Sequence, residues 1–173
     1  MSLLPRRIPV FGAMIFMACL LEAAHAQVIG DEAELDRLKA KAEDAMSNED
    51  AEGAAMSMGR AALMSAHLAR KETDPLRAQL FKTLEHLSRS QEHGYRAIAL
   101  FRRAGGGLPA SAGVCGSVQL GQLELQHTKA ALDQLPSAEP GHQSASRLKG
   151  LRQAMEEWST VLGAMQADYQ CPQ

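Results

Sequence analysis

Residues 144–169, SASRLKGLRQAMEEWSTVLGAMQADY, carry the pattern that decides the fold. Large apolar side chains recur in this stretch at alternating spacings of three and four residues, as one apolar face of an α-helix requires. This C-terminal seam consists of Leu148, Leu151, Met155, Trp158, Leu162, Met165 and Tyr169. Its three heptads predict a long helix that buries one side against other helices.

We expect the C-terminal seam to pack on other helices of the same chain. The segment 50–71 is rich in alanine, and such a small face lets a helix with large side chains approach closely. The alternative is a free stripe that pairs with a partner or with a second copy of the chain, as a homodimer. Its possible interaction face would be Leu151, Met155, Trp158, Leu162 and Met165.

The composition beyond the N-terminal segment favours helix throughout. Residues 27–173 contain 24 alanines but only 10 valines, isoleucines and threonines together. Alanine is the best helix former, whereas the β-branched residues are typical of sheets. No alternating apolar run is long enough for a convincing strand. We therefore predict an all-α fold of four to five helices with one disulfide.

Clusters of helix-breaking residues divide the chain into the expected helices. The first begins near Asp31, which can cap it with Glu34 reaching back. A third helix begins after the capping residue Asp74, with Pro75 at its first position, and ends before three consecutive glycines. The other expected helices cover about 50–71, from 109 or 110 to about 135, and 144–169.

The segment 78–111 resembles one tetratricopeptide repeat. The residues that carry the resemblance are Phe81 and Leu84 in a first helix, Gly94 at a turn, and Ala97, Phe101, Ala104 and Pro109 in the order A-x3-F-x2-A-x4-P. The resemblance implies helical hairpins joined at Gly94 and a recognition surface for another protein. A compact bundle without repeats is the other arrangement, and it places Gly94 inside one long helix.

The first 26 residues have the organisation of a secretory signal peptide. Arg6 and Arg7 precede an apolar stretch over 8–21, and Ala24-His25-Ala26 forms a small-residue cleavage site before Gln27. We therefore expect cleavage between Ala26 and Gln27, which leaves a single all-helical domain over 27–173. The signal is bacterial in style, so the expected location is the periplasm or the medium.

Lipidation at Cys19 is the alternative at the N-terminus, although Phe16-Met17 is a poor start for a lipoprotein box. No later stretch approaches 18 consecutive apolar residues, so we expect no transmembrane segment in the mature chain.

Two cysteines, Cys115 and Cys171, remain after cleavage. An even number of cysteines in an exported chain favours pairing, because the compartment is oxidising. We therefore predict a Cys115–Cys171 disulfide that fixes the C-terminal tail to the start of the fourth helix.

The histidines and methionines give no expected metal or catalytic site. His86 and His93 are seven residues apart, which places them about 10 Å apart along a helix, too far for one ion. Their neighbouring glutamates interleave with arginines, as on a solvated helix surface. His127 and His142 each stand alone in the sequence.

The Met56-Ser57-Met58 cluster, with Met64 and His67, resembles exported copper sites. Met56 and Met58 point about 200° apart on a helix. Methionine is more often a core residue, so we expect these side chains to pack.

Function is expected to be non-catalytic. The chain has no glycine loop for phosphate, no Rossmann pattern and no serine or zinc hydrolase motif, so no catalytic residue and no cofactor is expected. A net charge of −2 disfavours nucleic acid as a partner. We expect an exported helical protein that binds a protein partner in the cell envelope.

Two alternatives remain open. The chain could be an inhibitor or immunity-type protein that blocks a cell-wall hydrolase, through a loop at 105–112 or 136–144. It could instead be a carrier of a metal or small molecule.

Mass spectrometry of the exported protein tests the signal. Because Ala24-His25-Ala26 presents small residues at the cleavage site, the first residue should be Gln27. A diacylated chain beginning at Cys19 would contradict this prediction.

Overall fold

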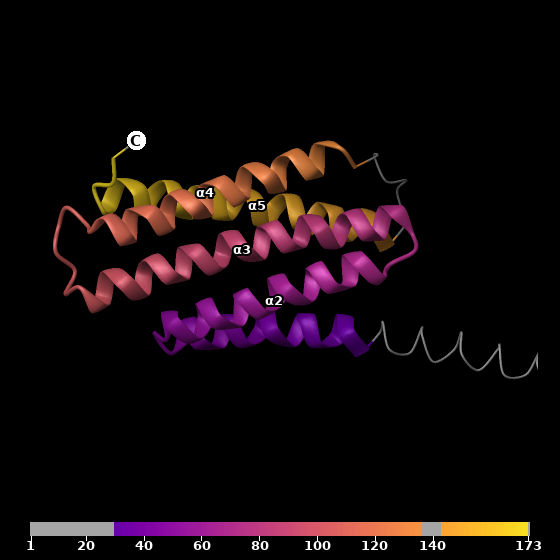
Figure 1. The fold of residues 1–173 in the computed structure, drawn as a ribbon, viewed down its shortest axis with the longest axis horizontal. Coiled ribbons are helices and arrows are strands. Elements are labelled where there is room, and N and C mark those ends of the chain that lie inside the picture. The colour runs from indigo at the N-terminus through magenta and orange to yellow at the C-terminus, as the bar shows by residue number, and fades with distance from the viewer. Residues whose placement is uncertain (1–29, 136–142, 173) are drawn as a thin grey trace, which may run out of the picture.

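The computed structural model describes residues 30–135 and 143–172, and these contain five helices and no strand. The all-helical prediction is therefore confirmed. The first helix covers residues 30–47, and we call it helix 30–47. The others are α2 (Ala51–Lys71), α3 (Pro75–Arg103), α4 (Ala112–Asp133) and α5 (Gln143–Asp168) (Figure 1). None of the described helices is both long and apolar enough to cross a membrane.

The helix α3 is the centre of the bundle. It lies between α2 and α4, and α5 packs against both α3 and α4 (Figure 1). Helix 30–47 contributes Leu35 and Leu38 to a core shared with α2 and α3. A second core joins α3, α4 and α5, and contains Val118 and Leu162. Helix 30–47 and α5 thus cover separate parts of the three central helices.

Side chains fix the helix starts, and two starts differ from expectation. Asp74 caps α3 as predicted, because its carboxylate accepts a hydrogen bond of 3.0 Å from the Leu76 amide. Asp31 is not a cap, since residue 30 is already helical. The helix α4 begins at Ala112 rather than at 109 or 110, because the cap is Ser111, whose hydroxyl accepts from Val114 N.

Two glycines let α5 lie against the backbones of α3 and α4. A Cβ atom on Gly94 would lie 2.6 Å from Cζ3 of Trp158. A Cβ atom on Gly121 would lie 3.1 Å from Leu162 and 3.3 Å from the Ser90 carbonyl oxygen. Trp158 and Leu162, one turn apart on α5, therefore occupy space that exists only because these positions have no side chain.

The same contact decides between the two expected arrangements. The tetratricopeptide resemblance places a turn at Gly94, but α3 continues through this residue, and Gly94 is buried within it. No tetratricopeptide repeat is identified over the described residues. The molecule is instead a bundle in which Gly94 receives an aromatic ring.

Buried hydroxyl groups also allow close packing around α3. Four serine and threonine side chains each donate to the carbonyl oxygen four residues earlier in their own helix: Ser65, Thr83, Ser117 and Thr128. These hydroxyls need no partner from another helix, so small polar residues fit into tight interfaces.

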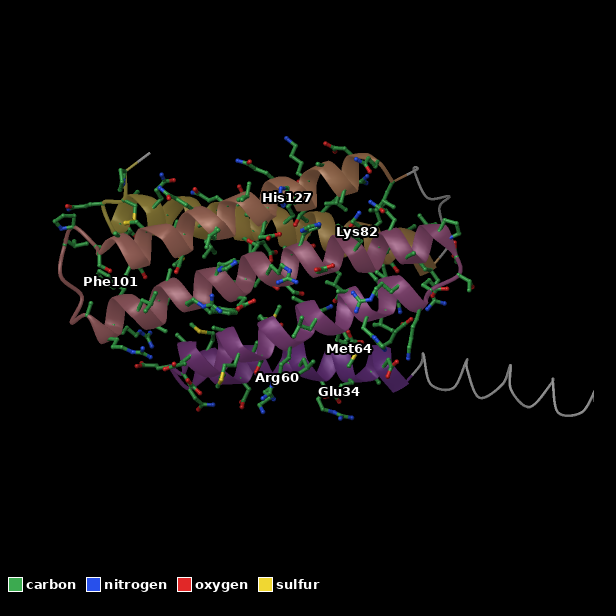
Figure 2. All side chains as sticks on the ribbon, in the orientation of Figure 1. Glu34, Arg60, Met64, Lys82, Phe101 and His127 are labelled. Carbon is green, nitrogen blue, oxygen red and sulfur yellow. A yellow bond between two sulfur atoms is a disulfide. The ribbon has the colours of Figure 1, made fainter. Side chains whose placement is uncertain are left out.

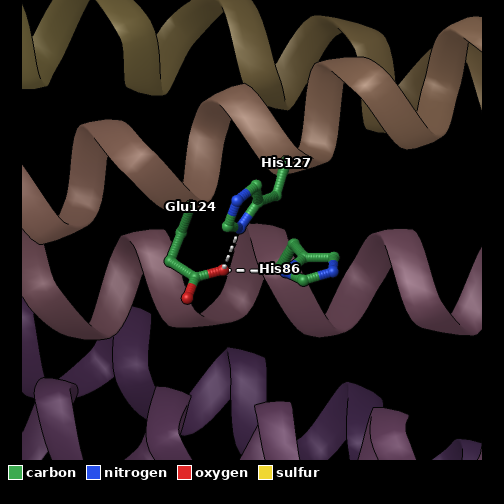
Figure 3. Close-up of side chains that lie close together, drawn as sticks. All are labelled: His86, Glu124 and His127. Atoms are coloured by element: carbon green, nitrogen blue, oxygen red, sulfur yellow. Dashed lines mark hydrogen bonds and ion pairs between the residues drawn. The ribbon is translucent and has the colours of Figure 1, made fainter.

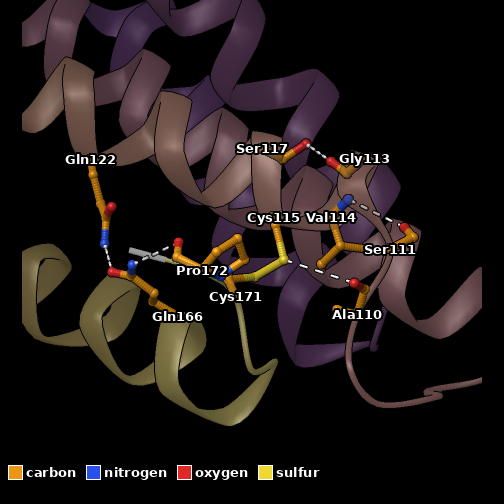
Figure 4. Close-up of a disulfide and its surroundings, with 10 residues drawn as sticks. All are labelled: Ala110, Ser111, Gly113, Val114, Cys115, Ser117, Gln122, Gln166, Cys171 and Pro172. Carbon is orange, nitrogen blue, oxygen red and sulfur yellow. Dashed lines mark hydrogen bonds between the residues drawn. A yellow bond between two sulfur atoms is a disulfide. The ribbon is translucent and has the colours of Figure 1, made fainter.

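The predicted disulfide is confirmed. Cys115 in the first turn of α4 is joined to Cys171, which follows the end of α5, with the two Cα atoms 5.3 Å apart (Figure 4). Nearby, Ala110 N donates to the Tyr169 carbonyl at 2.9 Å, and the Tyr169 ring stacks on Phe101. The C-terminal tail is thus held to α4 and to the loop before it.

The Gly94→Ala substitution should destabilise the protein. The added methyl group meets the Trp158 indole, which also packs edge to face against Tyr95 with ring centroids 5.0 Å apart. Overpacking of this kind costs about 1–3 kcal/mol, which exceeds the roughly 1 kcal/mol that alanine adds in helix propensity. Urea unfolding followed by circular dichroism measures the difference.

Gly163→Ala is the matched control, because an added Cβ at this exposed position of α5 meets nothing within 4 Å. It should leave stability unchanged or raise it by up to about 1 kcal/mol. If Gly94→Ala raised the free energy of unfolding as much as Gly163→Ala, the packing of Trp158 would not require a glycine at position 94.

Loss of the disulfide should lower the melting temperature. The bond spans a sequence separation of 56 residues, for which loop-closure entropy gives an upper value of roughly 4 kcal/mol. Thermal melts of Cys171→Ser and of reduced wild-type protein should show similar decreases. A native protein whose two thiols both react freely with a maleimide would contradict the prediction.

Candidate functional site

A groove lies between helix 30–47 and α5, with α3 as its floor. Its volume of about 380 Å³ is within the usual range of ligand pockets. We call it the α3 groove. Its lining residues are Leu80, Phe81, Leu84, Leu87, Gln91 and Tyr95 of α3; Glu32, Leu35, Asp36, Lys39, Ala42 and Glu43 of helix 30–47; Arg147, Gly150, Leu151 and Ala154 of α5; and Met58 of α2.

The floor of the groove is one continuous stripe of α3. Leu80, Leu84, Leu87, Gln91 and Tyr95 follow spacings of three or four residues, so they share one face of the helix. At 1.5 Å per residue this stripe extends over about 22 Å. The groove is therefore elongated and mostly apolar.

An ion-pair bridge crosses the groove near one end. Arg147 of α5 donates to Glu32 Oε2 at 2.8 Å, and Arg77 of α3 donates to the other oxygen of the same carboxylate. The Glu32 side chain is only 19% exposed, so water screens these contacts less than on an open surface. One carboxylate thereby joins both walls and the floor.

Polar groups along the groove are partly removed from water. Burial lowers the pKa of the Lys39 ammonium, against the opposing charge of Asp36. Burial, reinforced by the charge of Glu43, raises the pKa of the Tyr95 hydroxyl. Hydrogen bonds made to such groups are stronger than in bulk water, so they could orient a bound molecule.

The C-terminal seam packs mainly within the chain. Leu148, Leu162 and Met165 are buried, while Leu151, Met155 and Trp158 are half-buried against the same cores. The possible interaction face is thus largely inside the bundle, and it does not form a free stripe. Leu151 is the member that reaches the α3 groove.

Two histidines that look isolated in the sequence lie together. His86 of α3 and His127 of α4 have ring centroids 5.2 Å apart, in an edge-to-face arrangement. Glu124 lies between them, with one carboxylate oxygen 2.8 Å from His86 Nδ1 and 3.7 Å from His127 Nδ1 (Figure 3). The sequence therefore missed this grouping of His86 and His127, although His127 is half-exposed and the neighbouring glutamates of α3 do pair with arginines as expected.

The third described histidine on this side remains separate from the group. His93 lies two turns from His86 on α3, and its Nδ1 is buried without a hydrogen-bond partner. Burial lowers the pKa of the His93 imidazole, although Glu92 and Glu124 oppose the shift. The neutral ring is thus the favoured form.

The methionine cluster does not converge. Met58 is 3% exposed in the core of helix 30–47 and α2, whereas Met56 is 60% exposed on the opposite side of α2. Met64 packs against the same core as Met58 (Figure 2). Met58 and Met64 thus pack in the core as expected, whereas the exposed Met56 does not.

Several expected features lie outside the described residues. They are the signal segment with Cys19, Ala26 and Gln27, residue His142, and most of the loop at 136–144. The other candidate loop, 105–112, is described and mostly exposed, with Leu108 at 52% exposure, although its last residue already belongs to α4.

The sequence does contain a signal for the His86–Glu124 pairing. Ser117, Gly121, Glu124 and Thr128 are spaced by four, three and four residues, so they share one face of α4. Apart from Glu124 these residues are small, which indicates that this face packs closely on another helix. Close packing of Gly121 on Ser90 then places Glu124 one turn along, next to His86. This pattern predicts the His86–Glu124 contact only if α3 and α4 are already known to be antiparallel neighbours.

A scan against protein-family models and searches of curated proteins and of solved structures find no significant match to this chain.

Proposed function

We propose that this chain is an exported, non-catalytic binding protein, and that the α3 groove receives an amphipathic helix of a protein partner in the cell envelope. The observation that carries the proposal is the apolar floor of the groove, which runs for about 22 Å along α3. An amphipathic helix that lies in a groove presents apolar residues over a similar length, at spacings of three and four.

The surroundings of the floor favour a helix over a compact small molecule. Helix 30–47 and α5 form the two walls of the groove. The groove is elongated along the axis of α3 and is not a compact, enclosed cavity. A guest helix would be the third helix on this face of the bundle. Its apolar side chains would contact Leu84 and Leu151.

Charges on the outer wall suggest the polar edge of the partner. Asp36 and Glu43 are exposed on helix 30–47 beside the groove. A partner helix with lysine or arginine along this edge would complement them, which favours specificity and rapid association.

Photo-crosslinking from position 150 tests the proposal. A Cβ atom on Gly150 meets nothing within 4 Å, although the residue lines the groove, so a benzoylphenylalanine there should be tolerated. In cells that export the protein, we expect one discrete protein adduct. Mass spectrometry should place the crosslink on the apolar face of a helix.

Position 163 is the matched control, because Gly163 is an exposed glycine of α5 that also has open space around it. Benzoylphenylalanine there should not give the same adduct. With the identified partner, Leu84→Asp on the groove floor should weaken binding at least tenfold while circular dichroism shows an unchanged fold. Gly163→Leu should not weaken binding. The proposal is wrong if no protein adduct forms, if both positions give the adduct, or if folded Leu84→Asp protein binds the partner like the wild type.

The inhibitor function is the second candidate, and one observation favours it. The loop between α3 and α4 exposes Leu108, while Ala110 anchors the loop to α5 through the Tyr169 carbonyl. A fixed loop with an exposed apolar tip suits insertion into an enzyme cleft. Leu108→Asp should then abolish association with the partner, whereas Leu84→Asp in the groove should leave it intact.

A further inference from the structure

We propose that His86, Glu124 and His127 form a binding site for a divalent transition-metal ion, with Zn²⁺ as the representative ion. Each residue offers one ligand atom, and these three atoms all lie within 4.8 Å of one another. Tetrahedral coordination at zinc bond lengths places ligand atoms about 3.4 Å apart. The measured separations of 2.8 and 3.7 Å from the Glu124 oxygen to the two Nδ1 atoms lie on either side of this value.

The donor set selects the class of ion. Two imidazole nitrogens and one carboxylate oxygen suit zinc and neighbouring divalent metals, whereas calcium and magnesium prefer oxygen ligands alone. The two cysteines of the described residues are joined in the Cys115–Cys171 disulfide, so they offer no thiolate to the site. Three protein ligands leave a fourth position for water or for a group from another molecule.

The helices hold the ligands in place before an ion binds. Glu124 and His127 are three residues apart on α4, so they share one face, and His86 projects from α3 toward them (Figure 3). Thr128 and Thr83, which are fully buried beside the site, bond only within their own helices and let α3 and α4 approach. Binding therefore requires side-chain adjustment and no movement of a helix.

Solvent access is also suitable. The side chains of His86 and Glu124 are 24% and 19% exposed, so they are partly shielded from water. That of His127 is 50% exposed and lies at the surface of α4 (Figure 2). An ion can thus enter from the His127 side.

The Glu124 carboxylate and His86 Nδ1 already face each other at hydrogen-bond distance. A bound ion would replace this contact, because it takes one lone pair from each of the two atoms.

The site is separate from the α3 groove. His86 is about 200° around α3 from Leu84, which lies on the groove floor. Metal binding and partner binding therefore use different faces of the same helix, and the metal site does not rest on the proposed function.

Calorimetric titration with Zn²⁺ tests the site. The protein is the disulfide-bonded chain without a histidine tag, treated with a chelator and dialysed near neutral pH. We expect saturation at one ion per chain and an increase in melting temperature.

His127→Gln and Glu124→Gln identify the ligands. His127 is half-exposed, so its replacement should leave the fold intact, as circular dichroism will check. Each variant should bind Zn²⁺ at least tenfold more weakly and should lose the increase in melting temperature. His67→Gln on α2 is the control, and it should bind like the wild type.

Three outcomes would overturn the proposal. The wild-type protein could show no saturable binding, which would make the group a hydrogen-bonded cluster only. Both variants could retain wild-type affinity, which would place the ion elsewhere. Binding could be lost in His67→Gln instead, which would assign it to α2.

Discussion

The contact of Trp158 and Leu162 with the glycine positions of α3 and α4 is the constraint on which the rest of the structure depends. Because Gly94 and Gly121 have no side chain, α5 approaches both backbones at once. The position of α5 against these two backbones also places its groove-lining residues, which form one wall of the α3 groove. A larger residue at either glycine would move α5 outward and would change both candidate sites.

The two sites use α3 in different ways. The groove takes its apolar face, where large side chains from Leu80 to Tyr95 lie between two helices that do not meet over them. The His86–Glu124–His127 group takes the other face, where small residues bring α4 close enough for polar side chains to touch. The helix α3 thus borders the groove on its face of large side chains and packs closely on α4 on its face of small ones.

The sequence predicts the elements of this fold better than their contacts. Helix positions follow from local features, such as the spacing of the C-terminal seam, the Asp74 cap and the three glycines after α3, and these agree with the structure. The pairing of His86 with Glu124 depends on the register between α3 and α4, and local sequence does not specify that register across a separation of 38 residues. The Glu32 bridge is similar, because its partner Arg147 is 115 residues away. Gly94 is the intermediate case, since the same glycine suits a turn or a close helix contact until α5 is placed.

The disulfide divides the chain into parts that differ in their tolerance of backbone cleavage. A single break anywhere between residues 116 and 170 leaves one covalent molecule, because Cys115 and Cys171 still connect the two pieces. Residues 136–142 lie within this closed ring of the chain, so a cut there leaves α4 joined to α5 through the disulfide. A break between α2 and α3 has no such bridge, and packing and ion pairs alone would then retain helix 30–47 and α2. A single cut between Cys115 and Cys171 therefore leaves a nicked but covalently joined molecule, whereas a cut between α2 and α3 leaves two fragments that can dissociate.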